Sequence, residues 1–257
     1  MPMSKAILIT VRNGSSRLKN KALLKINNVT VIEYIIKRML HSKGADKIIL
    51  CTTENPKDDV LCDIAERNNI LFFRGDEEDK LERWNGACKH YGIEYFVTCD
   101  GDDLFCDTEL IDKAFEQYNT SNHDFLRCDG ITGSGNGIFD HGIKASALHK
   151  VCEIKDTKNT EMMWVYFTDT NLFRVQNLTD VPKSYFRDDI RMTLDYPEDL
   201  LFFKKIINYF GVNNHLPLSD IINYINLNPS VAKLNIQRQK EWKDNQVKNT
   251  KLILKKS

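Results

Sequence analysis

The sequence lacks several features that define whole classes of protein, and each absence narrows its function. Its 36 lysine and arginine residues balance 36 aspartate and glutamate residues, so overall charge gives no reason to expect a nucleic-acid partner. No apolar run approaches the roughly 18 residues of a membrane-spanning helix, so we expect no insertion into a membrane. Lys5 precedes only a strand-length apolar run, so we expect no signal peptide.

Cysteine and histidine are present, but not in patterns that form disulfides or metal sites. The seven cysteines include no C-x-x-C pair, and their odd number argues for reduced thiols. We therefore expect a cytoplasmic protein. The six histidines form neither an H-E-x-x-H motif nor a cysteine–histidine ligand spacing, so a zinc site is not expected.

Charge is distributed unevenly along the chain although its sum is zero. Residues 231–257 hold eight lysines and arginines against two acidic residues, so residues 1–230 are acidic overall. We predict that residues 231–257 form a basic, solvated C-terminal extension, with contact to an anionic partner as the alternative. The length of 257 residues favours one main domain over residues 1–230.

The first half alternates apolar segments of strand length with segments whose apolar residues recur every three or four positions. Such alternation predicts an α/β fold with right-handed crossovers and a mainly parallel sheet. Ligands bind such sheets beyond the carboxyl ends of the strands. The predicted strands are Ala6–Val11, Lys47–Thr53, Ile70–Arg74 and Tyr95–Cys99, and the predicted helices are Val29–His41, Asp58–Asn68, Asp79–Tyr91 and Thr108–Tyr118.

The second half has a less regular pattern, which predicts a small antiparallel lid or dimerisation element over residues 124–180. The glycine-rich segment 133–137 is predicted to form a flexible turn or lid. It is not a dinucleotide-binding fingerprint, because a strand-like segment follows it rather than a helix. Trp84, Trp164 and Trp242 lie in apolar or helical settings and are predicted to pack rather than to stack on a ligand. The predicted strands are Asp124–Cys128, Gly137–Lys144, Val165–Thr168 and Phe173–Val175, and the predicted helices are Ala145–Glu153 and Pro197–Phe210.

The most informative stretch follows the first predicted strand and runs from Val11 to Lys21. It is a short loop with glycine and serine that carries Arg12, Arg17 and Lys21. Backbone N–H groups and positive side chains that converge in this way can hold a triphosphate. The loop is not a Walker A motif, because it lacks the Gly-Lys-Ser/Thr ending. The alternative is a polar turn with solvated basic side chains.

Acidic residues follow the strand predicted at Tyr95–Cys99. Asp100, Asp102 and Asp103 lie at its carboxyl end, in the same predicted crevice as the basic loop. Hard oxygen ligands suit Mg²⁺ beside a phosphate, so this position favours a metal site over an Asp-rich surface turn. Asp195 precedes a predicted helix and is either an N-cap or a second carboxylate of the metal site.

Residues 74–83 read R-G-D-E-E-D-K-L-E-R and are almost entirely charged. Two interpretations are equally supported by this pattern. The segment is either the charged N-terminus of a helix or a loop that recognises a base or a sugar.

Four segments carry a resemblance to a known family. Gly14–Leu23 reads G-S-S-R-L-K-N-K-A-L, Gly75–Arg83 reads G-D-E-E-D-K-L-E-R, Asp100–Asp112 reads D-G-D-D-L-F-C-D-T-E-L-I-D, and Arg191–Leu200 reads R-M-T-L-D-Y-P-E-D-L. In the same order, they resemble motifs of cytidylyltransferases that make CMP-activated acidic sugars. The match is closer to the spore-coat-polysaccharide branch, which is related to CMP-Kdo synthetases.

The resemblance implies a Rossmann-like nucleotide-diphospho-sugar transferase fold, CTP as nucleotide donor, Mg²⁺ as cofactor, a small anionic acceptor and a homodimer. It implies that Lys21, Arg12 and Asp102 are catalytic and that Asp102 and Asp195 hold the metal. Residues 1–230 would then be the nucleotidyltransferase domain. The implied nucleotide-binding residues are Val11, Arg12, Asn13, Gly14, Ser15, Arg17, Lys21, Arg74 and Asp100, and the implied acceptor-binding residues are Asp76, Asp79 and Arg83.

Departures from the family motifs concern the acceptor side. Lys19 stands where the family has proline, and residues 160–166 lack the histidine of the corresponding family segment. We predict transfer of CMP from CTP to a sugar acid, sugar, polyol phosphate or phosphonate, with release of pyrophosphate, in polysaccharide biosynthesis. The alternatives are a nucleotidyltransferase that uses another nucleotide on a sugar phosphate, and a catalytically silent nucleotide-binding module.

Overall fold

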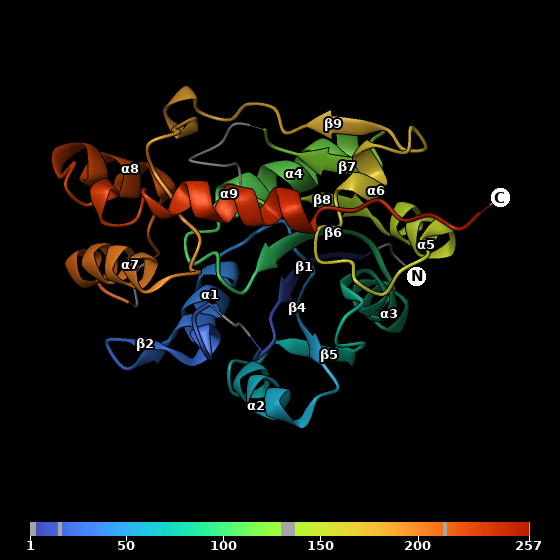
Figure 1. Cartoon of the computed structure of the whole chain (residues 1–257), viewed down its shortest axis with the longest axis horizontal. Helices are drawn as coiled ribbons and strands as arrows, with labels where there is room; N and C mark the ends of the chain where they lie inside the picture. Colours follow the sequence, from blue (N-terminus) through green and yellow to red (C-terminus); the bar gives the residue numbers. More distant parts are fainter. Residues whose placement is uncertain (1–3, 15–16, 130–136, 213–214, 257) are drawn as a thin grey trace.

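The computed structural model describes residues 4–14, 17–129, 137–212 and 215–256. A seven-stranded sheet of order β5-β4-β1-β6-β8-β7-β9 runs through the molecule, with helices on both faces (Figure 1). Within these residues β8 alone runs antiparallel to the other strands of the sheet. The predicted α/β fold with a mainly parallel sheet is confirmed.

The parallel half of the sheet consists of β5 (Leu71–Gly75), β4 (Lys47–Thr53), β1 (Ser4–Thr10) and β6 (Ile93–Asp100). These are the four strands predicted for the first half, with ends shifted by up to two residues. The chain runs from β1 to β4 and β5 on one side and then crosses to β6 on the other. Such a reversal opens a crevice at the carboxyl ends of β1 and β6.

The second half of the chain extends this sheet. β8 (Gly142–Lys144) pairs antiparallel with β6, and β7 (Phe125–Arg127) and β9 (Val175–Asn177) follow it. The antiparallel element predicted over residues 124–180 is therefore part of the main sheet in the described residues. Of the glycine-rich segment predicted as a turn or lid, residues 133–136 lie outside the described residues, and Gly137 is not in a strand.

The prediction of a strand at Val165–Thr168 is wrong, because this segment forms the one-turn helix α6. Val165, Tyr166 and Phe167 are all buried, and the Phe167 ring stacks on Phe125 of β7 with 4.6 Å between centroids. Consecutive apolar residues look alike in a buried strand and a buried helix. Hydrophobic periodicity therefore could not separate the two.

Five helices cover one face of the sheet and share a hydrophobic core with Ile7 and Ile9 of β1. The first of them begins with a capping box, in which Thr30 and Glu33 bond each other's backbone N–H groups. A two-stranded hairpin, β2 (Lys25–Ile26) and β3 (Val29–Thr30), leads into it. The helices are α1 (Val31–Met39), α2 (Asp59–Arg67), α4 (Thr108–Thr120), α7 (Pro197–Phe210) and α8 (Leu218–Leu227).

The opposite face is covered by α3 (Lys80–Tyr91), α5 (Ala145–Ile154) and α6, which pack on Ala6 and Leu8 of β1. Trp84 of α3 is fully buried in this layer, as predicted, and its indole N–H donates to Thr10 Oγ1 at 2.7 Å. No helix in the described part of the chain is both long and apolar enough to cross a membrane.

The prediction that residues after 230 form a solvated extension is wrong in part. Most of this segment is exposed, but five of its described residues are buried. It forms α9 (Arg238–Asn249), in which Gln239 and Trp242 are buried. Farther along, Leu254 forms a β-bridge with Lys155. Composition was misleading because the three lysines of α9 are exposed, while only some of its neutral residues pack inward.

We expect Gly142→Ala to destabilise the fold, because a Cβ at this position would lie 2.0 Å from the Tyr95 hydroxyl. Tyr95 is fully buried and its hydroxyl is hydrogen-bonded to His123, so the ring has little room to move. Overpacking of this kind costs about 1–3 kcal/mol of unfolding free energy, measurable by denaturant unfolding. The exposed Ser146→Ala serves as control, and equal stability of the two variants would contradict the tight packing of β8 on β6.

Candidate active site

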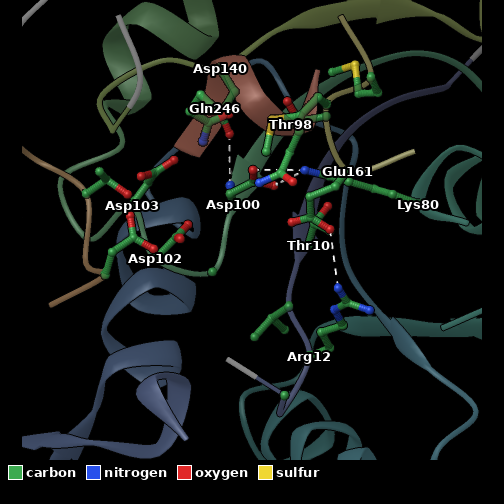
Figure 2. Close-up of a pocket in the computed structure, with 18 of the residues that line it drawn as sticks. Thr10, Arg12, Lys80, Thr98, Asp100, Asp102, Asp103, Asp140, Glu161 and Gln246 are labelled. Carbon is green, nitrogen blue, oxygen red and sulfur yellow. Dashed lines mark hydrogen bonds and ion pairs between the residues drawn. The ribbon is translucent and has the colours of Figure 1, made fainter. Parts of the chain in front are cut away.

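A cavity of about 560 Å³ lies at the carboxyl ends of β1 and β6 (Figure 2). Its walls come from the loop after β1, the start of α3, the turn after β6, the segment before α7, and α9. The residues that line it include Thr10, Val11, Arg12, Gly14, Arg17, Lys21, Lys80, Arg83, Asp100, Asp102, Asp103, Asp140, Glu161, Trp164, Asp195, Trp242, Asn245, Gln246 and Asn249.

The loop after β1 brings most of its predicted residues to this cavity, namely Val11, Arg12, Gly14, Arg17 and Lys21. The loop ends in a short 3-10 turn at Lys21–Leu23. Before this turn, Asn20 adopts a left-handed conformation with φ of 52°, which asparagine tolerates better than most residues.

Asn13, which was also predicted to bind the nucleotide, is not among the residues that line the cavity. The Asn13 backbone N–H donates to Asp58 at 2.7 Å, and its side chain donates to the Lys57 carbonyl at 3.0 Å. Asn13 therefore ties the loop to the turn before α2. Ser15 lies outside the described residues.

The Lys21 ammonium lies between the two carboxylates that were predicted to hold a metal. It donates to Asp102 Oδ2, and to Asp195 Oδ1 at 3.1 Å. Arg17 also donates to Asp195 Oδ1, at 2.6 Å. Residues far apart in the sequence thus converge on a single charged cluster at the edge of the sheet.

The charges in this cluster are unevenly compensated. Burial favours the neutral form of Lys21, but the two carboxylates outweigh it and hold the pKa of Lys21 well above its usual value. Burial would raise the pKa of Asp195, but attraction to Lys21 and Arg17 holds it well below. For Asp102, burial, together with repulsion from Asp195 and Asp100, outweighs Lys21 and raises the pKa. Asp102 is therefore the carboxylate whose negative charge is least balanced.

A second layer of buried charge holds Asp195 in place. The fully buried Arg191 donates to Asp195 Oδ2 at 3.0 Å and to Asp199 Oδ1 at 2.9 Å. Asp199 in turn accepts the backbone N–H groups of Asp195 and Tyr196. Asp195 is not the N-cap of α7, because that position is Tyr196.

Asp100 and Arg12 are held by partners that sequence reasoning did not single out. Lys80 Nζ donates to both carboxylate oxygens of Asp100, at 2.8 and 2.9 Å. Arg12 pairs with Glu161 at 3.3 Å and donates to the Glu77 carbonyl at 2.7 Å. Figure 2 shows Arg12 at one end of the cavity and Asp102 at the other side of Asp100.

The charged segment 74–83 is mostly structural. Arg74 does not line the cavity, because it is bound to Asp59 at 2.6 Å and to backbone carbonyls. Asp79 is the buried N-cap of α3, and Asp76 accepts backbone N–H groups of the turn before it. Of the predicted acceptor-binding residues, only Arg83 lines the cavity.

Asp103 and Asp140 are buried acids in the cavity wall, and Asp140 went unnoticed because no motif contains it. Asp140 Oδ2 accepts the backbone N–H of Asp100 at 2.9 Å. Burial and repulsion from Asp100 raise the pKa of Asp140 to about 8. Burial and repulsion from Asp140 likewise raise the pKa of Asp103 well above its usual value.

The remaining wall comes from α9, which no motif indicated. Trp242, Asn245, Gln246 and Asn249 all line the cavity. Trp242 packs as predicted but also faces the site, and Trp164, just before α6, lines it as well. A helix in a lysine-rich stretch has no sequence signal that relates it to a site whose motifs all lie earlier in the chain.

The chain belongs to the cytidylyltransferase family, which matches residues 6–216. It is 31% identical over 92% of its length to an uncharacterised protein of Methanocaldococcus jannaschii, covering 97% of that protein. It is also 25% identical over 88% of its length to the spore coat polysaccharide biosynthesis protein SpsF of Bacillus subtilis, covering 95% of that protein. The family predicted from the four motifs is confirmed.

Solved structures agree with this assignment. A cytidylyltransferase from Leptospira borgpetersenii superposes with a TM-score of 0.80 and 27% identity, over 90% of this chain and 97% of that one. A CMP:2-keto-3-deoxy-manno-octonic acid synthetase in complex with CTP superposes with a TM-score of 0.62 and 13% identity, over 81% of this chain and 100% of that one. The fold is thus that of the nucleotide-diphospho-sugar transferases.

We expect Asp140→Asn to stabilise the protein increasingly as pH rises. The folded-state pKa of about 8 lies above that of an unfolded aspartate, so the wild type loses stability as pH rises toward 8. An amide at this position retains the acceptor for the Asp100 N–H and does not ionise. Denaturant unfolding of both proteins at about pH 5 and about pH 8 should show a difference that grows by the order of 1 kcal/mol per pH unit. A difference independent of pH would contradict a protonated Asp140.

Proposed function

We propose that the protein is a CTP-dependent cytidylyltransferase, which transfers CMP from CTP to a small acceptor and releases pyrophosphate. The observation that carries the proposal is the convergence, in one cavity, of the basic loop with Asp102 and Asp195 around Lys21. Membership of the family supports a nucleotidyltransferase. The similarly folded synthetase in complex with CTP supports CTP as donor, and the name of SpsF supports a role in polysaccharide biosynthesis.

The acceptor we propose is a small anionic molecule: a sugar acid, a sugar carrying an anionic group, a polyol phosphate or a phosphonate. Among the basic side chains that line the cavity, Arg83 has no carboxylate partner in the described structure, which favours binding of a second anionic group beside the triphosphate. We further propose that the protein acts as a homodimer in the cytoplasm. Its seven cysteines are all buried and form no disulfide, which supports that compartment.

In the proposed reaction an acceptor oxygen attacks the α-phosphorus of CTP, and the bond from that phosphorus to the pyrophosphate oxygen breaks. Arg12 and Arg17 orient the triphosphate from the loop, and Lys21 neutralises negative charge that develops on the α-phosphate and the leaving group. No covalent enzyme intermediate is needed. Catalysis then comes mainly from positioning of the reactants and neutralisation of charge. Lys21 is suited to the second role because the two carboxylates hold its ammonium in place.

The donor set suits Mg²⁺. Asp102 and Asp195 already share one cation, the Lys21 ammonium, and the charge of Asp102 is poorly compensated. No group of three or more metal-ligating side chains occurs in the described residues. This fits Mg²⁺, which proteins commonly bind through one or two carboxylates together with substrate phosphates. Held by Asp102 and Asp195, Mg²⁺ would supply charge neutralisation beside the phosphates.

A nucleotide screen tests the proposal against its alternatives. Pyrophosphate release is measured with CTP, UTP, ATP and GTP, each with a panel of sugar acids, sugars, polyol phosphates and phosphonates. We expect release with CTP and one class of acceptor. Turnover only with another nucleotide would favour a different nucleotidyltransferase, and CTP binding without release would favour a silent module.

We expect Asp102→Asn to lower turnover by at least about a hundredfold, because loss of one metal carboxylate removes several kcal/mol of transition-state stabilisation. Asp102 is less buried than Asp195, so thermal unfolding should change little. Asp195→Asn should lower both activity and stability, because it also disturbs Arg191. Near wild-type activity of Asp102→Asn at limiting Mg²⁺ would exclude this residue as a ligand.

We expect Lys21→Ala to lower kcat by at least about a hundredfold. The substitution removes the ammonium that would neutralise negative charge at the reacting phosphate, and loss of one such donor typically has an effect of this size. Lys19→Ala provides a matched control two residues earlier in the loop. Lys19 is exposed, so its loss should cost less than about threefold. Steady-state kinetics compare the two, and equal losses would mean that the wrong lysine has been assigned to the phosphate.

A further inference from the structure

The helix α9 lies outside the segment that matches the family and yet forms one wall of the cavity. Figure 1 shows α9 running across the molecule from the side of α7 and α8, and the chain after the helix continuing toward α6 and α5. In Figure 2 Gln246 lies beside Asp140, with Arg12 at the far end of the cavity. Arg12 and Gln246 therefore face the site from different ends. Arg17, by contrast, lies over the Tyr196 ring that Arg238 of α9 also contacts.

Both ends of α9 are anchored. At its start, Arg238 pairs with Glu198 of α7 at 2.8 Å, and Gln239 accepts a hydrogen bond from Arg191 at 3.1 Å. Beyond its end, the backbone of residues 253–255 bonds to residues 154–156, with the Asp156 N–H donating to the Ile253 carbonyl at 2.9 Å. The face that α9 presents to the cavity is thus held in a defined position.

That face is neutral although the segment around it is strongly basic. Residues 231–257 contain eight lysines and arginines, and none of them is among the residues lining the cavity. The residues of α9 that do line it are Trp242, Asn245, Gln246 and Asn249. An anionic group placed against α9 would have no positive partner on the helix.

The amide of Gln246 has unused hydrogen-bonding capacity. Its Oε1 is buried and has no hydrogen-bond partner within the described structure. A buried acceptor without a partner is unfavourable unless a ligand completes it. A side-chain amide both donates and accepts, as a hydroxyl group does, whereas a carboxylate only accepts.

We propose that α9 binds the hydroxylated body of the acceptor, a sugar or alditol chain, and that Gln246, with Asn245 and Asn249, determines its specificity. The inference rests on the proposed function and adds to it. The reacting anionic group of the acceptor lies toward Lys21 and the arginines of the loop. Its uncharged hydroxyl groups lie against the amides of α9.

Calorimetry with two probes of equal chain length tests this proposal. Ribitol phosphate and pentyl phosphate carry the same anionic group, but only the first carries hydroxyls along its chain. Each is titrated into protein saturated with CTP, with EDTA present to prevent transfer. We expect the wild type to bind ribitol phosphate more tightly than pentyl phosphate. Gln246→Leu should bind ribitol phosphate about tenfold more weakly than the wild type, because it loses one buried hydrogen bond to the ligand.

Lys248→Leu is the matched control, because it places the same residue on the exposed side of the same helix. It should keep the preference, and both variants should keep wild-type affinity for CTP and the wild-type unfolding temperature. Failure of wild type to bind CTP would contradict the proposed function itself. With CTP bound, absence of a preference in wild type, an unchanged preference in Gln246→Leu, or loss of CTP affinity in that variant would overturn the role assigned to α9.

Discussion

The buried negative charge of Asp195 is the constraint on which the cavity depends. A carboxylate that is 1% exposed must be neutralised or paired, and Asp195 receives Lys21, Arg17 and Arg191. Two of these partners come from the loop after β1, and the third comes from the segment before α7. The same charge therefore fixes the loop, the carboxylate pair and the start of α7 relative to one another.

Much of this arrangement could be predicted because it obeys local rules. Buried parallel strands appear as continuous apolar runs, as at Lys47–Thr53, and parallel strands present their carboxyl ends on one edge. The placement of Lys21, Asp102 and Asp195 around one point follows from that geometry together with the family motifs. For the same reason the cavity-lining positions of Arg12, Gly14 and Arg17 agree with prediction.

What could not be predicted depends on tertiary contacts. Arg74 and Asp79 lie in a motif-like charged segment, but the first is held by Asp59 and the second by Lys155, and neither pairing has a sequence signal. Asp140 becomes part of the site only because β8 inserts beside β6 and brings the segment before it to Asp100. The inward face of α9 was hidden because the helix also carries three exposed lysines.

The anchoring of α9 through Arg191 and Glu198 has a consequence for how the site assembles during synthesis. Residues that line the cavity range from Thr10 to Asn249, so nearly the whole chain separates its first wall from its last. A nascent chain that has folded β1 to α7 already holds the basic loop and both carboxylates, but one side of its cavity is open to water. The cavity gains its last wall only after α9 has left the ribosome and docked.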